Sequence, residues 1–294
     1  MRFLSIGECM VELAPLAGQT FGQGFAGDTF NTVWYLAGLR PDVGCSYLTC
    51  VGTDALSDRF MTELAARGID QRAVHRRADR TMGLYMISLQ DGERSFSYWR
   101  ENSAARMLAE NAGRLRSAMA PADMVYFSGI TLAILGPRSR LRLLDALSEA
   151  RGRGVRVAFD PNLRPGLWEN PEAMRHWVML GAEASDIVLP SFQDEQVHFG
   201  DTDPQATLAR YGSVQGVVVK NGGGAIHYRW DEQTGCVTPP QVNIIDTTAA
   251  GDSFNAGLFA CLDKHMSMED RLLQASAVAG QVIQSRGALV DLAA

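Results

Sequence analysis

The chain has 294 residues, of which 46% are apolar and 20% charged, as is ordinary for a globular protein with an extensive core. Its formal net charge of −6, with no polybasic run, excludes an electrostatic footprint for nucleic acid or for a membrane surface. No segment approaches the ~20 apolar residues of a membrane span, and the apolar stretch before Glu8 is too short for a signal peptide. The five cysteines form no CxxC pair and no zinc pattern, so we expect free thiols in a reducing cytoplasm.

Short apolar runs alternate with longer amphipathic segments along the chain. The short runs predict strands at 3–6, 46–51, 123–128, 155–160, 185–189 and 215–220. The amphipathic segments predict helices at 28–39, 54–67, 137–152, 171–182, 203–212, 251–264 and 268–285. This alternation is typical of a mostly parallel sheet with helices on both faces, whose ligands bind beyond the carboxyl ends of the strands. No repeat or linker divides the sequence, so we expect residues 1–294 to form a single domain.

A glycine-containing segment near the N-terminus matches a nucleotide-binding pattern. Residues 22–27 read Gly-Gln-Gly-Phe-Ala-Gly, which fits the GxGxxG pattern of dinucleotide-binding loops. A Rossmann loop follows the first strand directly, but here a long segment that includes Pro15 separates the glycines from the strand at 3–6. We therefore disfavour a nicotinamide-dependent dehydrogenase, an alternative that nicotinamide binding would test.

Residues 83–100 interrupt the alternation of strands and helices. Two β-rich runs flank Asp91-Gly92, which predicts a hairpin with a type I′ turn. Counting outward from this turn predicts the cross-strand pairs Ile87–Phe96 and Tyr85–Tyr98. Alternation then places Arg100 on the same face as both tyrosines. An antiparallel hairpin inserted into a parallel α/β chain is a candidate lid, and an edge hairpin with a half-buried aromatic face is the alternative.

Two glycine-containing loops are candidates for binding phosphates. Residues 220–225 read Lys-Asn-Gly-Gly-Gly-Ala after a predicted strand, where the glycines let the backbone lie close to a ligand, although a simple hairpin turn also fits. Residues 246–257 read Asp-Thr-Thr-Ala-Ala-Gly-Asp-Ser-Phe-Asn-Ala-Gly and lead into a helix. Small residues at 249–251 expose consecutive N–H groups at the helix N-terminus, which binds anions. Asp252 lies in the first turn, where a simple capping role is the alternative.

Residues 246–257 resemble the C-terminal signature of the PfkB-type, or ribokinase-like, carbohydrate kinases. The resemblance extends over about residues 3–290 and implies a three-layer α/β/α fold with a small β-sheet lid, here at about 8–24 and 80–100. It also implies that Ala249, Ala250 and Gly251 form the anion hole for the transferred phosphoryl group and that Asp252 is the catalytic base. The family usually has glycine at the position of Ala249, and we expect ordinary backbone angles there because alanine tolerates positive φ poorly.

The same resemblance implies the remaining contacts. Gly27, Asp28 and Asn31 correspond to the family's N-terminal sugar site. The implied nucleotide-binding residues are Ser191, Lys220, Asn221, Gly222, Gly223, Gly224 and Ala225. ATP and Mg²⁺ are the implied cofactors, with K⁺ as a further candidate ion. Where the family has Asn-x-x-Glu near Mg²⁺, this chain has Ser191 followed by Asp194 and Glu195, and either acid could act through water.

The hairpin indicates the substrate. Its residues resemble those of the 2-keto-3-deoxygluconate kinases, which implies that Tyr85, Tyr98 and Arg100, together with Arg164, bind a sugar acid. Guanidinium groups match carboxylates in bidentate geometry, although either arginine could instead pair with a surface acid. A fructokinase or other neutral-sugar kinase, and a non-catalytic sugar- or nucleotide-binding protein, are the alternatives. The exposed edges of the lid predict a homo-oligomer formed through it.

Overall fold

The computed structural model describes residues 1–17, 19–90 and 93–292. A nine-stranded sheet forms its centre, with the order β13-β12-β11-β10-β9-β8-β1-β4-β5. Seven of these strands run parallel: β1 (Arg2–Ile6), β4 (Gly44–Val51), β5 (Val74–Arg76), β8 (Met124–Ser128), β9 (Arg156–Asp160), β10 (Ile187–Val188) and β11 (Gly216–Val219). The last two, β12 (Ile226–Trp230) and β13 (Gln233–Val237), continue the sheet in antiparallel order.

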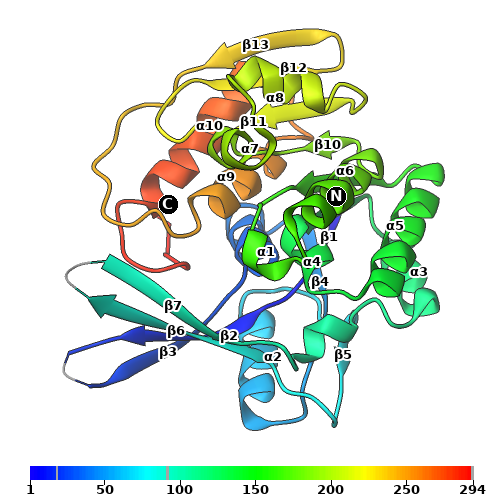
Figure 1. Ribbon diagram of the computed structural model, residues 1–294, viewed down its shortest axis with the longest axis vertical. Helices are drawn as coiled ribbons and strands as arrows, with labels where there is room; N and C mark the ends of the chain where they lie inside the picture. Colours follow the sequence, from blue (N-terminus) through cyan, green and yellow to red (C-terminus); the bar gives the residue numbers. More distant parts are fainter. Residues whose placement is uncertain (18, 91–92, 293–294) are drawn as a thin grey trace.

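Helices cover both faces of this sheet, so the predicted α/β architecture is confirmed (Figure 1). Successive side chains of a strand point to opposite faces of the sheet and so enter two separate cores. In β1, Leu4 and Ile6 lie in one core and Phe3 lies in the other. The face with Phe3 packs against α1 (Asp28–Leu39), α2 (Ala55–Ala66), α9 (Ala250–Phe259) and α10 (Met268–Val282). The opposite face packs against α3 (Ala112–Met119), α4 (Gly129–Ala133), α5 (Pro137–Gly152), α6 (Pro171–Glu183), α7 (Phe192–Phe199) and α8 (Pro204–Arg210).

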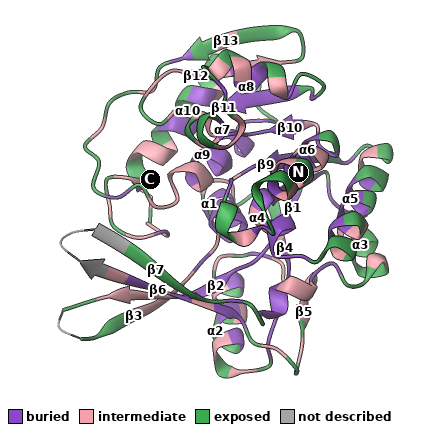
Figure 2. Ribbon diagram, in the orientation of Figure 1, coloured by how far each residue is buried: buried purple, intermediate pink, exposed green. Residues whose placement is uncertain are grey.

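A smaller four-stranded sheet has the order β3-β2-β6-β7 and projects from one side of the molecule (Figures 1 and 2). Its strands are β2 (Met10–Pro15), β3 (Phe21–Ala26), β6 (Gly83–Gln90) and β7 (Glu93–Trp99). The predicted pairs are confirmed, since Tyr85 lies opposite Tyr98 and Ile87 opposite Phe96. The predicted turn at Asp91-Gly92 lies outside the described residues.

Every predicted strand and helix is present, but several elements were not predicted. They are β5, β12 and β13 and the helices α3, α4 and α7. Strands β2 and β3 show no strand pattern of their own, but they lie mainly in the β-sheet lid segment that the resemblance implied at about 8–24. Helix α4 has five residues, too few for a helical period to be visible, and β3 contains two glycines that weaken a strand pattern. Among the described residues, no helix is long and apolar enough to cross a membrane.

Candidate active site

Asp252 lies in the first turn of α9 and faces α1. The side-chain amide of Asn31 donates to its carboxylate at 2.8 Å, and the Thr32 hydroxyl donates to its backbone carbonyl at 3.3 Å. Removal from water, together with the nearby carboxylate of Asp28, raises the pKa of Asp252 to about 7. Such a carboxyl group can accept a proton near neutral pH, as a general base must.

A second carboxylate, Asp28, lies beside Asp252 at the start of α1. Burial raises its pKa, although hydrogen bonds oppose this effect, and the Asn162 side chain donates to Asp28 at 2.7 Å. Asp28 and Asn31, which were predicted for the sugar site, thus both lie next to Asp252. Gly27 precedes them, and a Cβ there would lie 2.2 Å from the Glu8 carbonyl oxygen, so only glycine fits.

Lys220 provides a cation at the same end of the sheet. Its ammonium group donates to Asp160 at 2.5 Å and to the Asn255 side-chain oxygen at 3.3 Å, while the Asn255 amide donates to Asp160 at 2.6 Å. The same ammonium lies 3.5 Å from the place of a Cβ on Gly251. The Lys220 side chain therefore lies beside residues 249–251, which we call the anion turn, rather than with the glycine loop 221–225 that follows it in sequence.

The anion turn differs from the expectation in one respect. Ala249 has φ 59° and ψ 14°, so the prediction of ordinary backbone angles at this residue is wrong. The turn into α9 requires a left-handed residue before Ala250, whatever side chain is present, and the strain at a Cβ-bearing residue is of order 1–2 kcal/mol. No helical carbonyl precedes the amides of Gly251 and Asp252, so these N–H groups are available to an anion.

The loop that was predicted to bind nucleotide connects β11 to β12 as a hairpin connection. Gly222 has φ 53°, the amide of Gly224 donates to the Asn221 carbonyl at 2.8 Å, and the Gln241 side chain donates to the Gly223 carbonyl at 3.2 Å. The segment is thus the hairpin turn of the alternative interpretation, with open space at Gly222 but not at Gly224, where a Cβ would lie 2.7 Å from the Asn221 side chain. Nucleotide binding by this loop stays a prediction. Ala225 ends the loop before β12.

The structure separates the two acids considered for Mg²⁺. Asp194 lies within 3.6 Å of Arg164, and burial raises the pKa of Asp194 while Arg164 opposes the shift. Glu195 is fully buried, accepts a hydrogen bond from Tyr211 at 2.9 Å, and has its pKa raised to about 8 by burial. Ser191 precedes both at the N-cap of α7 without a side-chain cap bond. Among the described residues, no cluster of three or more His, Cys, Asp or Glu could hold a metal alone.

Residues of the smaller sheet have partners within the protein. Tyr85 donates its hydroxyl to Glu12, and its ring centre lies 6.0 Å from that of Tyr98. Arg100 forms a buried ion pair with Glu8, and its guanidinium carbon lies 6.0 Å from the centre of the Tyr98 ring, which agrees with the predicted shared face. Arg164, by contrast, keeps 53% of its side chain exposed.

Several residues of this neighbourhood were missed in the sequence. Asp160 is the last residue of a predicted strand and Asn162 lies two residues beyond it, and this position at a strand's carboxyl end is the signal that could have found them. Asn255 lies three residues after Asp252 on the same helix, a spacing that brings two side chains to one face. Glu8 carries no local signal, because its partner lies 92 residues away.

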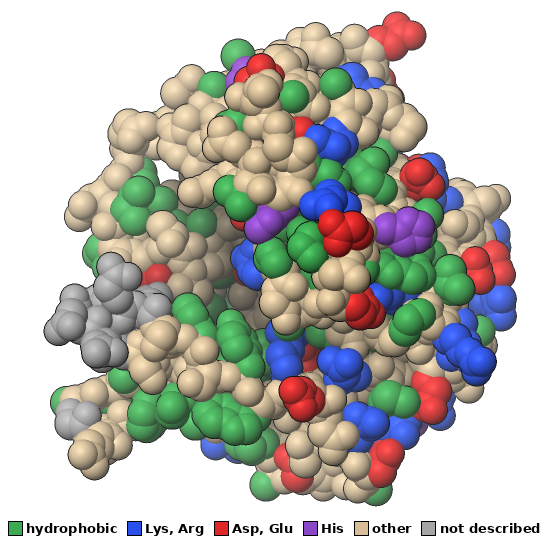
Figure 3. Space-filling model, in the orientation of Figure 1, with side chains coloured by type: hydrophobic (Ala, Val, Ile, Leu, Met, Phe, Trp, Pro, Cys, Tyr) green, Lys and Arg blue, Asp and Glu red, His purple; other side chains and the backbone are tan. Residues whose placement is uncertain are grey.

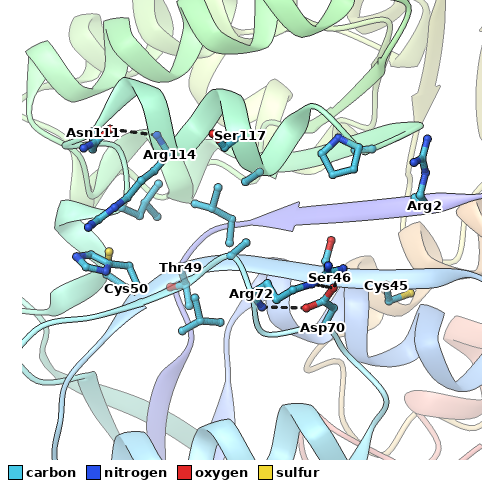
Figure 4. A pocket seen from close by; sticks show the side chains of 18 of the residues that line it. Arg2, Cys45, Ser46, Thr49, Cys50, Asp70, Arg72, Asn111, Arg114 and Ser117 are labelled. Carbon is cyan, nitrogen blue, oxygen red and sulfur yellow. Dashed lines mark hydrogen bonds and ion pairs between the residues drawn. The ribbon is translucent and has the colours of Figure 1, made fainter.

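A cavity of about 770 Å³ lies elsewhere, between β4, β5 and α3 (Figure 4). Arg114, Ser46, Thr49 and Cys50 are among its lining residues, and none of the predicted site residues is. Figure 3 shows a separate hollow between the smaller sheet and the body of the molecule.

The sequence is similar to carbohydrate kinases over nearly its whole length. The sequence matches the model of the pfkB family of carbohydrate kinases over residues 2–293. It is 36% identical to the 2-dehydro-3-deoxygluconokinase of Haemophilus influenzae, over 97% of this chain and 94% of the relative. It is also 36% identical to the Escherichia coli K12 protein of that name, over 97% and 96% of the two chains. A fructokinase of Vibrio alginolyticus is 26% identical, over 92% and 87%.

Solved structures share the fold. The fructokinase with bound ATP from Xylella fastidiosa has a TM-score of 0.85 at 23% identity, covering 98% of this chain and 93% of that one. The 2-dehydro-3-deoxygluconokinase of Thermotoga maritima has a TM-score of 0.84 at 21% identity, covering 99% and 96%. A putative ribokinase II from Escherichia coli, in complex with ATP and Mg²⁺, has a TM-score of 0.84 at 24% identity, covering 98% and 94%.

The chain has the ribokinase-like α/β fold of these solved structures. The sequence match over nearly its whole length makes the assignment narrower. The chain belongs to the pfkB family of carbohydrate kinases.

Proposed function

We propose that this protein transfers the γ-phosphate of ATP to the terminal primary hydroxyl of 2-keto-3-deoxygluconate, forming the 6-phosphate. The observation that carries this proposal is Asp252, a carboxylate of raised pKa held by Asn31 at the N-terminus of α9. The identity of 36% with relatives named for this reaction supports the choice of substrate. ATP, as its Mg²⁺ complex, supplies the phosphoryl group.

The residues around the anion turn have complementary tasks in this proposal. Asp252 accepts the proton of the sugar hydroxyl as the hydroxyl oxygen attacks the γ-phosphorus of ATP. The new O–P bond forms while the bond between the γ-phosphorus and the β,γ-bridging oxygen breaks, and ADP leaves with that oxygen. The free amides of Gly251 and Asp252, with the Lys220 ammonium beside Gly251, stabilise negative charge on the phosphoryl oxygens, whereas the amide of Ala250 donates to the Thr247 carbonyl at 3.2 Å. Asp160 holds Lys220 in place.

In this proposal, residues of α1 and of the smaller sheet recognise the sugar. Gly27, Asp28 and Asn31 bind sugar hydroxyls from α1, while Tyr85, Tyr98 and Arg100 act from the smaller sheet, which serves as the lid of a single kinase domain. The loop 221–225 binds the nucleotide, with Ser191 nearby. Of the two acids considered, Asp194 is the better candidate to hold Mg²⁺ through water, because Glu195 is directed into the protein interior toward Tyr211.

The proposal also covers activation by K⁺, the cellular location and the oligomeric state. K⁺ is a candidate activator, to be tested by comparing turnover in potassium and sodium salts. The cysteines are all free, and four of the five are buried, which supports a reducing, cytoplasmic location. The lid sheet is proposed to join two copies of the chain.

A neutral ketose is the second candidate substrate, and one observation favours it. Arg100, which is proposed to bind the carboxylate of a sugar acid, is already paired with Glu8. A fructokinase is also among the relatives, at 26% identity.

ATP turnover against a panel of sugar acids and neutral sugars tests both candidates. We expect the highest kcat/KM for 2-keto-3-deoxygluconate, since a site built for a charged group rejects analogues that lack it. A higher kcat/KM for fructose would replace the sugar acid with the ketose. No ADP release with any sugar would instead indicate a binding protein without activity.

A further inference from the structure

The segments that connect the two sheets converge on Glu8. This residue lies between β1 of the large sheet and β2 of the smaller one. Its carbonyl oxygen lies against Gly27, where the chain leaves β3, and its side-chain Oε1 would lie 2.9 Å from a Cβ on Gly83, where the chain enters β6. Its carboxylate pairs with Arg100, directly after the end of β7. Glu8 thus stands at the base of the lid.

The ion pair is withdrawn from water and incompletely hydrogen-bonded. The Glu8 side chain is 1% exposed and that of Arg100 10% exposed. Within the described part of the chain, Glu8 Oε1 and Arg100 Nε are buried without a hydrogen-bond partner. The charge of Arg100 is therefore balanced by a group of the protein before any substrate arrives, and the effective interaction between charges here is stronger than at the surface.

An acidic substrate changes this balance. Its carboxylate would make Arg100 the shared partner of two anions, and the repulsion between them is little screened in a buried place. A neutral ketose meets no such repulsion. Arg164 is more exposed and lies 3.6 Å from Asp194, so it provides a weaker and better screened attraction.

We propose that Glu8 is a specificity-determining residue that competes with the carboxylate of an acidic substrate for Arg100. The inference rests on the proposed function, because it presumes that sugar acids bind beside Arg100. Glu8 sets how strongly the site prefers an acid to a neutral sugar, while it also holds the guanidinium beside Tyr98. The loss of its charge weakens the positioning of Arg100 but removes the repulsion, and we expect the second effect to be the larger because the pair is buried and incompletely hydrogen-bonded.

The test is Glu8→Gln, which keeps the size and an oxygen acceptor and removes the charge. We expect KM for 2-keto-3-deoxygluconate to fall about tenfold, with kcat and the KM for fructose within about twofold of wild type. Glu149→Gln is the matched control, since Glu149 also pairs with an arginine, Arg116, but on the surface. It should change neither KM.

If Glu8 had only a structural role, its substitution would not lower the KM for the sugar acid while leaving the KM for fructose unchanged. An unchanged or raised KM for the acid in folded Glu8→Gln enzyme would overturn the inference. Because breaking a buried ion pair can unfold a protein, Glu8→Asp is the second variant. It withdraws the carboxylate by one methylene and should lower the KM for the acid by a smaller factor.

If neither variant folds, Glu8 is a structural residue and the inference is wrong. Failure of the proposed function is distinguishable, because wild-type enzyme would then turn over no sugar acid. Failure of this inference alone leaves a wild-type enzyme that phosphorylates the acid, with a preference that does not depend on Glu8.

Discussion

The side-chain amide of Asn31 donates a hydrogen bond to the carboxylate of Asp252 at 2.8 Å, across 221 residues of sequence. This bond joins the N-terminal sugar segment to the C-terminal anion turn and orients the proposed base. Asp252→Asn keeps the size of the side chain and removes its ability to accept a proton. We expect kcat to fall by ~10²–10⁴-fold while ATP binding, measured by calorimetry, is retained. Retention of more than a tenth of the wild-type kcat would contradict the role of Asp252.

The thermal stability of Asp252→Asn, compared with wild type at two pH values, is an independent check on the raised pKa of Asp252. The pKa of Asp252 is raised to about 7 from the ordinary 3.8, so the folded protein holds the proton more tightly than the unfolded chain. The carboxyl group therefore favours folding at low pH, and this contribution is lost as the pH rises through about 7. The Tm of Asp252→Asn relative to wild type should be higher at pH 8 than at pH 5.

The pH dependence of turnover is a second prediction. A base must be ionised, and burial with the nearby Asp28 carboxylate raises the pKa of Asp252 to about 7. Below this value we expect kcat/KM to fall tenfold for each pH unit, and above it to reach a plateau. Stopped ADP-release assays between pH 5 and 9 measure the profile. A plateau that extends unchanged down to pH 5 would exclude a base with this pKa.

Gly251 tests the anion turn. Its Cβ position points toward the Lys220 ammonium at 3.5 Å, so the branched side chain of Gly251→Val would fill the place assigned to the phosphoryl oxygens. We expect turnover to be abolished while sugar binding stays measurable by calorimetry. Gly136→Val is a suitable control, because a Cβ at Gly136 meets no atom within 4 Å. Near-normal turnover in folded Gly251→Val would show that these amides do not hold the phosphate.

The two arginines proposed for the sugar acid should differ in effect. Arg100→Ala removes a buried cation and leaves the Glu8 carboxylate unpaired, so an acidic substrate is repelled. We expect kcat/KM for 2-keto-3-deoxygluconate to fall ~30-fold or more, with a far smaller loss for fructose. Arg164→Ala, at a side chain that is 53% exposed, should cost less than tenfold, as for a screened surface charge. Equal losses for acid and ketose in both variants would remove the arginines from acid recognition.

The lid should join two subunits. Apolar side chains gather on the smaller sheet, as Figure 3 shows, and Phe21, Phe96 and Trp99 are 44%, 46% and 58% exposed. We expect a dimer at micromolar concentration by light scattering, weakened by Trp99→Lys. Val197→Lys is the matched control, since Val197 is 68% exposed on α7, away from the lid. A monomer in the wild-type sample would refute the lid interface.

Local sequence patterns determined the regular elements and the central motif. The helices at 28–39 and 137–152 match α1 and α5 residue for residue, because a long amphipathic period is decided within the segment itself. The Tyr85–Tyr98 pairing followed from alternation around one turn. Asp252 and its small-residue turn were recognisable because all the groups that form the turn are consecutive in sequence.

Only the tertiary structure decided which charges meet. Glu8 pairs with Arg100, and Lys220 with Asp160, across 92 and 60 residues. These choices depend on where strand ends lie after the sheets have packed, which no local period encodes. The left-handed backbone of Ala249 is likewise imposed by the path of the chain from its preceding loop into α9, against the preference of alanine. The sequence therefore predicted the segment that we propose to carry the chemistry, while packing determined which charged groups lie beside Asp252 and which acid pairs with Arg100.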